Sequence, residues 1–251
     1  SEFNGSRPLS LLICPNKKIY FGEYFSNNKN KEVRIFCSDN GTDWNTVYKF
    51  NPREIRHIHS LQYDEYRKGI WVMTGDSNSE SGIWFTSDGF KSLKKVVDQG
   101  QRGRAVNIII LQDSLIIPMD SPDEKNYISE YDFKNNQINE LCSVKNSVFH
   151  ICKIDQIYLM STVPEPSYVN DVNNVYVYAS LDCRKWQVIS VFKKDIIPGY
   201  LQKYTRYPEV EFCEGTNSSK YIIGYSNSPQ SMGGDGAIYI NIKNINKYKN
   251  N

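Results

Sequence analysis

The sequence predicts an all-β chain that folds as a five-bladed β-propeller, and three observations lead to this prediction. Short runs rich in Tyr, Ile and Val alternate with Gly, Asp, Asn and Ser, as is typical of strands and turns. No segment shows the apolar period of a helix. A pattern of about four short strands recurs every roughly 40–60 residues, which is the spacing of propeller blades. A β-sandwich with chance self-similarity is the alternative.

Residues 56–97 show the repeating pattern most clearly. An alternating segment and an apolar run are followed by a polar loop at 75–81 and two further strands. We expect the strands of this unit at 56–63, 70–74, 82–86 and 94–97. The second strands of the other four predicted units begin at Ile19, Ile116, Ile157 and Tyr221. The fifth unit lacks a convincing fourth strand, so residues before Leu9 or the C-terminal tail would have to close the ring.

Length and charge narrow the classes of protein. A chain of 251 residues fits a single propeller domain over 1–251, with residues 1 to about 6 read as a tag or linker. The net charge of +2 and the dispersed basic residues argue against a nucleic-acid partner. No apolar stretch is long enough to predict a membrane span. The oligomeric state stays open, as does the compartment, which is either the bacterial cytoplasm or, after removal of a signal peptide, an exported location.

The predicted turns between third and fourth strands share a Ser/Thr, Asp and Trp pattern. The first turn, 37–44, reads Cys-Ser-Asp-Asn-Gly-Thr-Asp-Trp, and the turns at 86–93 and 180–186 keep parts of it. We expect each Asp to bond the backbone of its own turn and each Trp to pack beneath it. The residues predicted to be structural in this way are Asp39, Gly41, Trp44, Asp88, Asp182 and Trp186.

These turns resemble the Asp-box, S-x-D-x-G-x-T-W, of the bacterial neuraminidase (BNR) repeat. The chain is therefore similar over most of its length to the sialidase-like Asp-box propellers. Segments 22–44 and 55–76 look most like bacterial members that are associated with surface-polysaccharide genes. The resemblance implies a carbohydrate context and places the Asp boxes away from the active site. Sialidases have six blades, so the five predicted here argue against that specific activity.

Propeller topology predicts where a site would form, because the starts of first strands and the ends of second strands open on one face. We expect a central funnel there in which basic and acidic side chains meet. The predicted catalytic residues are Asp76, Asp120, Glu23 and His57. The predicted substrate-binding residues are Arg56, His59, Arg104, His150, Tyr204 and Arg206. In the alternative reading, such Arg–carboxylate pairs only tie neighbouring blades together.

Three functions fit this residue set. Arginine binds carboxylate or sulfate groups through two parallel hydrogen bonds, and paired carboxylates hydrolyse glycosidic bonds. The first hypothesis is therefore a sialidase-like glycoside hydrolase, or a degenerate relative, acting on an acidic bacterial polysaccharide. A non-catalytic glycan-binding or scaffold protein is the second, and a His/metal-dependent polysaccharide lyase is the third. No cofactor is expected, although His57 and His59, with Asp76, have the spacing of divalent metal ligands.

Overall fold

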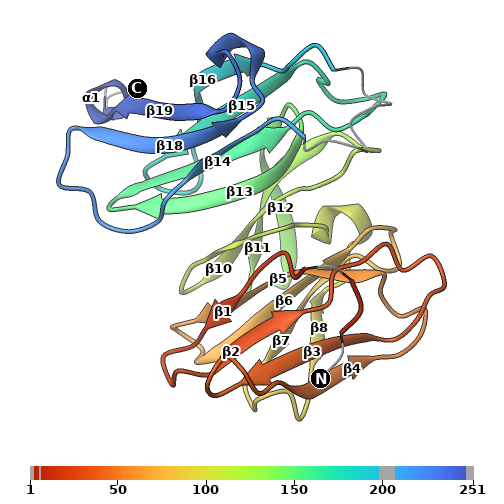
Figure 1. The fold of residues 1–251 in the computed structure, drawn as a ribbon. Coiled ribbons are helices and arrows are strands. Elements are labelled where there is room, and N and C mark those ends of the chain that lie inside the picture. The colour runs from red at the N-terminus through yellow and green to blue at the C-terminus, as the bar shows by residue number, and fades with distance from the viewer. Residues whose placement is uncertain (1–2, 6, 198–206, 247–251) are drawn as a thin grey trace. The chain divides into compact units, whose positions relative to one another are not determined.

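The computed structural model describes residues 3–5, 7–197 and 207–246, and it is nearly all β, with 49% of residues in strands and 4% in helices. Its strands form five antiparallel sheets (Figure 1). The chain divides into two compact units, Ser1–Ile117 and Pro118–Asn251. The single domain over 1–251 and the count of five blades stay predictions. Within the described ranges, no helix has the length and apolar character that crossing a bilayer needs.

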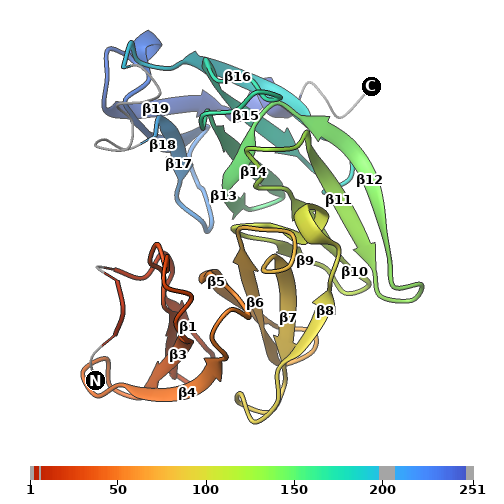
Figure 2. The same ribbon diagram turned by 90° about the vertical axis from the view of Figure 1, so that its right-hand side faces the viewer.

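The first two sheets each have four strands in chain order, and Figure 2 shows β6, β7 and β8 side by side. The first sheet contains β1 (Leu12–Ile13), β2 (Ile19–Gly22), β3 (Val33–Ser38) and β4 (Asn45–Phe50). The second contains β5 (His57–Asp64), β6 (Gly69–Gly75), β7 (Gly82–Thr86) and β8 (Lys94–Val97). The strands predicted for residues 56–97 are therefore confirmed to within a residue or two at each end.

The remaining sheets follow the same meander. The third contains β9 (Ile109–Ile110), β10 (Ser114–Pro118), β11 (Asn126–Asp132) and β12 (Gln137–Val144). The fourth contains β13 (Ser147–Ile154), β14 (Ile157–Val163), β15 (Asn174–Ser180) and β16 (Gln187–Lys193). The fifth contains only β17 (Glu209–Phe212), β18 (Tyr221–Asn227) and β19 (Gly236–Asn241) among the described residues. Three short helices complete the described chain: η1 (Gly100–Gly103), η3 (Gln230–Met232) and α1 (Ile242–Asn246).

The core of the first unit explains why β6 reads as a continuous apolar run instead of an alternating one. All seven residues of β6 are buried, so both faces of this strand are covered. Val72 packs in a cluster with Phe50, Ile58 and Trp84. In the second unit, a comparable buried cluster includes Leu159, Val177, Val210, Ile222 and Ile240. Burial of such side chains is the main favourable term in folding.

The β3–β4 turn is held by side chains that accept hydrogen bonds from its backbone. The buried Ser38 Oγ accepts from the amides of Asn40 and Gly41, at 3.2 and 2.8 Å. The Asn40 Oδ1 accepts from the amides of Thr42 and Asp43, each at 2.9 Å. These bonds close the turn with Gly41 at a φ of 78°, a conformation that glycine adopts without strain.

The structure corrects the role predicted for Asp39. Its side chain is 78% exposed and pairs with Lys18 at 2.9 Å, so it does not bond the turn. The neighbouring Asn40 makes the bonds that the sequence analysis assigned to Asp39. Trp44 does have a structural role, because its indole donates to the Gly41 carbonyl and its ring packs against Phe21, 4.8 Å between centroids.

The other two turns have the Ser/Thr and Asp residues at the predicted positions, and only the first turn is displaced by one residue, to Ser38 and Asn40. In the β15–β16 turn, Ser180 accepts from two amides, Asp182 from the amides of Arg184 and Lys185, and Trp186 donates to a turn carbonyl. In the β7–β8 turn, Asp88 accepts from the amide and hydroxyl of Ser92, and these bonds lower the pKa of Asp88 to about 2. Both aspartates therefore accept hydrogen bonds from the backbone of their own turns.

Replacing Asn40 by Ala should destabilise the protein, whereas replacing Asp39 by Ala should not. Asn40→Ala removes two backbone hydrogen bonds and should lower the free energy of unfolding by about 0.5–1.5 kcal/mol. Asp39→Ala removes one exposed ion pair, and solvent screening leaves such a pair with little effect on stability. Urea unfolding of both variants measures the difference. If Asp39→Ala lowered the free energy of unfolding as much as Asn40→Ala or more, the role predicted for Asp39 from the sequence would be correct.

Asp64, at the end of β5, is a buried carboxylate that accepts hydrogen bonds from groups of its own β5–β6 hairpin. It accepts from the amides of Tyr66 and Arg67, the guanidinium of Arg67 and the indole of Trp71, at 2.8–2.9 Å. Burial by itself raises the pKa of Asp64, but the bonds from Arg67 and Trp71 outweigh it and lower the pKa. The charged form of Asp64 therefore stabilises the fold.

The lowered pKa of Asp64 predicts a loss of stability in acid. A carboxyl group with a depressed folded-state pKa contributes stability above its unfolded pKa, near 4, and loses that contribution as the pH falls through the lower folded value. Urea midpoints measured from pH 7 down to pH 2.5 should fall less for Asp64→Asn than for the unchanged protein. The exposed neighbour Glu65 provides the control, because Glu65→Gln should leave the acid-induced loss unchanged. Identical pH profiles for Asp64→Asn and the unchanged protein would contradict this role.

Candidate functional site

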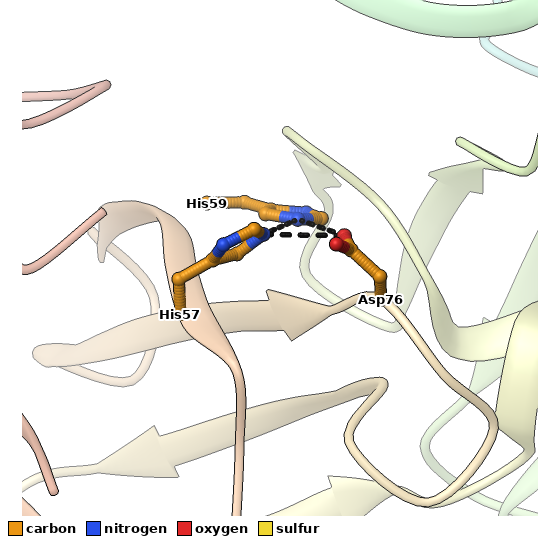
Figure 3. A group of neighbouring side chains, drawn as sticks. All are labelled: His57, His59 and Asp76. Carbon is orange, nitrogen blue, oxygen red and sulfur yellow. Dashed lines mark hydrogen bonds and ion pairs between the residues drawn. The ribbon is translucent and has the colours of Figure 1, made fainter. Parts of the chain in front are cut away.

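The pairing of β5 with β6 brings two histidines and an aspartate together. His57 lies opposite Gly75, and the register shifts between Ile58 and Ser60, so His59 is the extra residue of a β-bulge. Asp76 follows directly after β6. A bulge changes the direction of side chains near it, and here it allows both imidazoles to converge on one carboxylate. Figure 3 shows the three side chains facing one another.

The three side chains form a small triangle of atoms. The His57 Nε2 lies 3.2 Å from the His59 Nε2 and 3.1 Å from the Asp76 Oδ1. The His59 Nε2 lies 3.4 Å from the same Asp76 oxygen. Both imidazoles are buried, while the Asp76 side chain is 29% exposed. Asp76 is therefore the member of the triangle that is most exposed to solvent.

Backbone carbonyls fix both imidazole rings from behind. The His57 Nδ1 lies 3.0 Å from the carbonyl oxygen of Phe25, and the His59 Nδ1 lies 2.9 Å from that of Ala105. A carbonyl oxygen only accepts, so each Nδ1 carries a proton and donates it. The Nε2 atoms are consequently the ones presented to the site. The ring of Tyr24 packs against His57, with 4.3 Å between centroids.

Two arginines complete the site around Asp76. Arg104, which is buried, places its NH2 group 3.3 Å from the Asp76 Oδ1 and donates from NH1 to the Asp76 backbone carbonyl at 3.0 Å. Gln101 donates to the same carbonyl at 2.8 Å. Arg56 is 40% exposed, and its Nε lies 3.6 Å from the Asp76 Oδ2. The site thus places two guanidinium groups around one carboxylate.

Asp76 is a carboxylate in this environment. Burial by itself raises the pKa of Asp76. Hydrogen bonding with His57 and His59, followed by the charges of His57 and Arg104, outweighs burial and holds the pKa well below its usual range. Asp76 can therefore accept hydrogen bonds or bind a cation at neutral pH, and it is a poor proton donor.

Five predicted site residues lie together: Arg56, His57, His59, Asp76 and Arg104. Glu23, predicted to be catalytic, does not join them, and its role is corrected. Its buried carboxylate is bonded to the amide and guanidinium of Arg34, each at 2.8 Å, and to the amide of Asn4 at 2.6 Å. Glu23 holds strand β3 to the loop that follows β2, and this contact is structural.

The other predicted residues lie in the second unit or outside the described ranges. Asp120 is buried just after β10. His150, on β13, pairs with Glu209 on β17 at 2.8 Å. Their roles at a shared site stay predictions, as do those of Tyr204 and Arg206, which lie outside the described residues.

The sequence analysis did not identify Gly75 and Gln101 as parts of the site. A Cβ added at Gly75 would lie 2.6 Å from the His59 Cε1, so only glycine leaves room for the His59 ring. Gly75 does end the apolar run of β6, and a glycine at that point in a strand indicates a close approach of neighbouring groups. Gln101 lies in the short helix η1, outside the strand ends from which the sequence analysis chose its site residues.

Comparisons with known proteins define the fold class. The chain resembles a chain of the nidogen–laminin complex, with a TM-score of 0.56 and 11% identity over 93% of this chain and 75% of that one. It also resembles a prolyl endopeptidase (TM-score 0.51, 13% identity, covering 89% and 33% of the two chains) and puromycin hydrolase (0.51, 7%, covering 87% and 33%). No family model and no curated protein matches the sequence.

These likenesses, at such low identity, concern the fold alone. Together with the five antiparallel sheets they show that the chain is a β-propeller. It spans about a third of the prolyl endopeptidase and puromycin hydrolase chains, each 33% covered. The Asp-box family itself stays a prediction.

Replacing Gly75 by Ala should disturb the site. The added methyl group would overlap the His59 ring, and overpacking of this kind typically costs about 1–3 kcal/mol. We expect a lower melting temperature and a shifted imidazole signal of His59 in NMR spectra. Gly236, in β19, is the control, because the nearest atom to an added Cβ there is 4.0 Å away. Equal melting temperatures for Gly75→Ala and Gly236→Ala would contradict this packing argument.

Proposed function

We propose that the protein is a carbohydrate-active β-propeller that binds an acidic glycan at the cluster around Asp76. One observation carries the proposal: Arg56 is 40% exposed beside the site, and its Nε donates to the Ser26 carbonyl at 3.0 Å. Within the described part of the chain, the terminal nitrogens of Arg56 make no hydrogen bond. A guanidinium that presents two N–H groups in this way binds a carboxylate or sulfate in a bidentate manner.

The charge balance supports an anionic ligand. Arg56 and Arg104 carry two positive charges, and Asp76 carries one negative charge. The guanidinium charges therefore outnumber the carboxylate charge of Asp76 in this cluster. Tyr24, half-buried beside His57, adds an aromatic surface of the kind that sugar-binding sites combine with a few polar groups. The resemblance of the turns to sialidase-like propellers supports a carbohydrate as the ligand.

Binding is better supported than hydrolysis. Glycoside hydrolysis needs one carboxyl group that donates a proton and a second carboxylate at a defined separation. Asp76 is surrounded by histidines and arginines, and Glu23 is bonded to Arg34 and Asn4. Neither group of the first unit is arranged as a proton donor. We therefore place the non-catalytic glycan-binding function ahead of the glycoside hydrolase.

Arg56→Ala should weaken binding of an acidic oligosaccharide. We expect a hexamer of galacturonic acid to bind the unchanged protein, with an affinity that falls as salt is added. Loss of a charged hydrogen-bonding partner should reduce the affinity about tenfold, which corresponds to about 1.4 kcal/mol. Isothermal titration calorimetry with this hexamer and with the neutral galactose hexamer measures both effects.

Lys49→Ala is the control, because Lys49 is exposed on β4 and the variant loses the same charge elsewhere. Equal binding of the neutral hexamer, or binding that Arg56→Ala leaves unchanged, would refute the proposal. Release of new reducing ends from the hexamer by the unchanged protein, lost in Asp76→Asn, would instead favour the hydrolase.

A further inference from the structure

The triangle formed by His57, His59 and Asp76 leads to an inference that does not depend on the glycan. We propose that these three side chains bind a divalent transition-metal ion. The three atoms are separated by 3.1, 3.2 and 3.4 Å. A point in their plane lies about 1.9 Å from each atom, so an ion displaced slightly from the plane reaches the bond lengths of about 2.0–2.1 Å found for zinc and imidazole nitrogen.

The protonation of the histidines supports a cation at this point. Because each Nδ1 donates to a carbonyl, the Nε2 of a neutral ring presents a lone pair to the site. Without a proton or an ion between them, two lone pairs and a carboxylate oxygen would lie within 3.4 Å of one another, which is unfavourable. A single shared proton can occupy only one of the three contacts at a time. A metal ion satisfies all three.

The surroundings are those of a metal site. Ligating histidines almost always donate their second N–H to a carbonyl or carboxylate, which fixes the tautomer and the ring orientation. Phe25 and Ala105 supply such carbonyls, and Arg104 and Gln101 hold the backbone at Asp76. The ligands are therefore held in place by the fold before any ion binds.

The donor atoms define the class of ion. Two imidazole nitrogens and one carboxylate suit zinc, iron or manganese, whereas calcium and magnesium prefer sites built from oxygen. Three protein ligands leave at least one coordination position open, as in catalytic zinc sites. Of the three side chains, Asp76 is the most exposed to solvent. A bound ion would add positive charge close to Arg56 and so favour an acidic ligand.

The site is tested with the full chain after removal of metals with EDTA, using Zn²⁺ as the probe. We expect one Zn²⁺ per chain by titration calorimetry with competition from a chromophoric chelator. Loss of a group that hydrogen-bonds to a metal ligand typically weakens metal binding 10–100-fold. Loss of a ligand itself, in His59→Gln or Asp76→Asn, should therefore weaken Zn²⁺ binding by about 100-fold or more. Zn²⁺ should raise the melting temperature of the unchanged protein and not that of Asp76→Asn.

His150→Ala is the matched control. His150, with Glu209 and Glu211, forms the second His/carboxylate cluster of the described chain, and it is more exposed than the first. The variant should bind Zn²⁺ like the unchanged protein. No binding by the unchanged protein, unaltered binding by His59→Gln and Asp76→Asn, or loss of binding in His150→Ala would each overturn the proposal.

If circular dichroism shows that both His59→Gln and Asp76→Asn misfold, the proposal is tested on the unchanged protein instead. X-ray absorption of the zinc complex should then show two imidazole ligands. A zinc environment without two imidazoles would overturn the assignment equally well. Because Zn²⁺ alone is the probe, failure of the glycan experiment and failure of this one are distinguishable.

Discussion

The backbone register between β5 and β6 is the constraint on which the candidate site depends. It places His57 opposite Gly75, and the bulge after Ile58 gives His59 no partner on β6. A shift of one residue would turn every side chain of β5 to the other face of the sheet. The absence of a side chain at Gly75 is part of the same constraint, because the His59 ring occupies that space. Strand pairing, a bulge and one glycine thus position the imidazoles.

The β5–β6 hairpin carries a buried or half-buried carboxylate near each of its ends, and their partners differ in kind. Asp64 accepts only from groups that must donate: two amides, an indole and a guanidinium. The fold itself therefore supplies the hydrogen-bond donors for Asp64. Asp76 meets two imidazole nitrogens, which can act as donors or acceptors, and an arginine that remains partly exposed. The first carboxylate is therefore structural, and the second retains the capacity to bind something further.

The strands could be predicted because their signals are local. The run at Ile70–Thr74 is apolar throughout since β6 is covered on both faces, and Gly, Asp and Asn mark its ends. The convergence of Arg56, His57, His59, Asp76 and Arg104 also follows from strand order. Details of side-chain geometry could not be predicted. Whether Asp39 or Asn40 bonds the turn depends on a one-residue difference in turn conformation, and Glu23 is occupied by Arg34 because of pairing across β2 and β3.

The fourth sheet shows that the fold does not need the histidine pair. Its first two strands, β13 and β14, have the same bulge, with the register shift between Val148 and His150. At the positions that match His57, His59 and Gly75, this sheet has Ser147, Phe149 and Val163. His150 corresponds to Ser60, one position past the bulge, which is why the sequence repeat made it look equivalent to the site histidines.

The same backbone arrangement is therefore built in the second unit without two imidazoles and a carboxylate in contact. Burying such groups carries an electrostatic penalty of several kcal/mol per ion unless they are paired or bind a ligand. Since a hairpin with the same bulge forms with Ser, Phe and Val at these positions, the bulge alone does not account for His57 and His59. The difference between the two hairpins is the physical reason to assign the cluster a binding role.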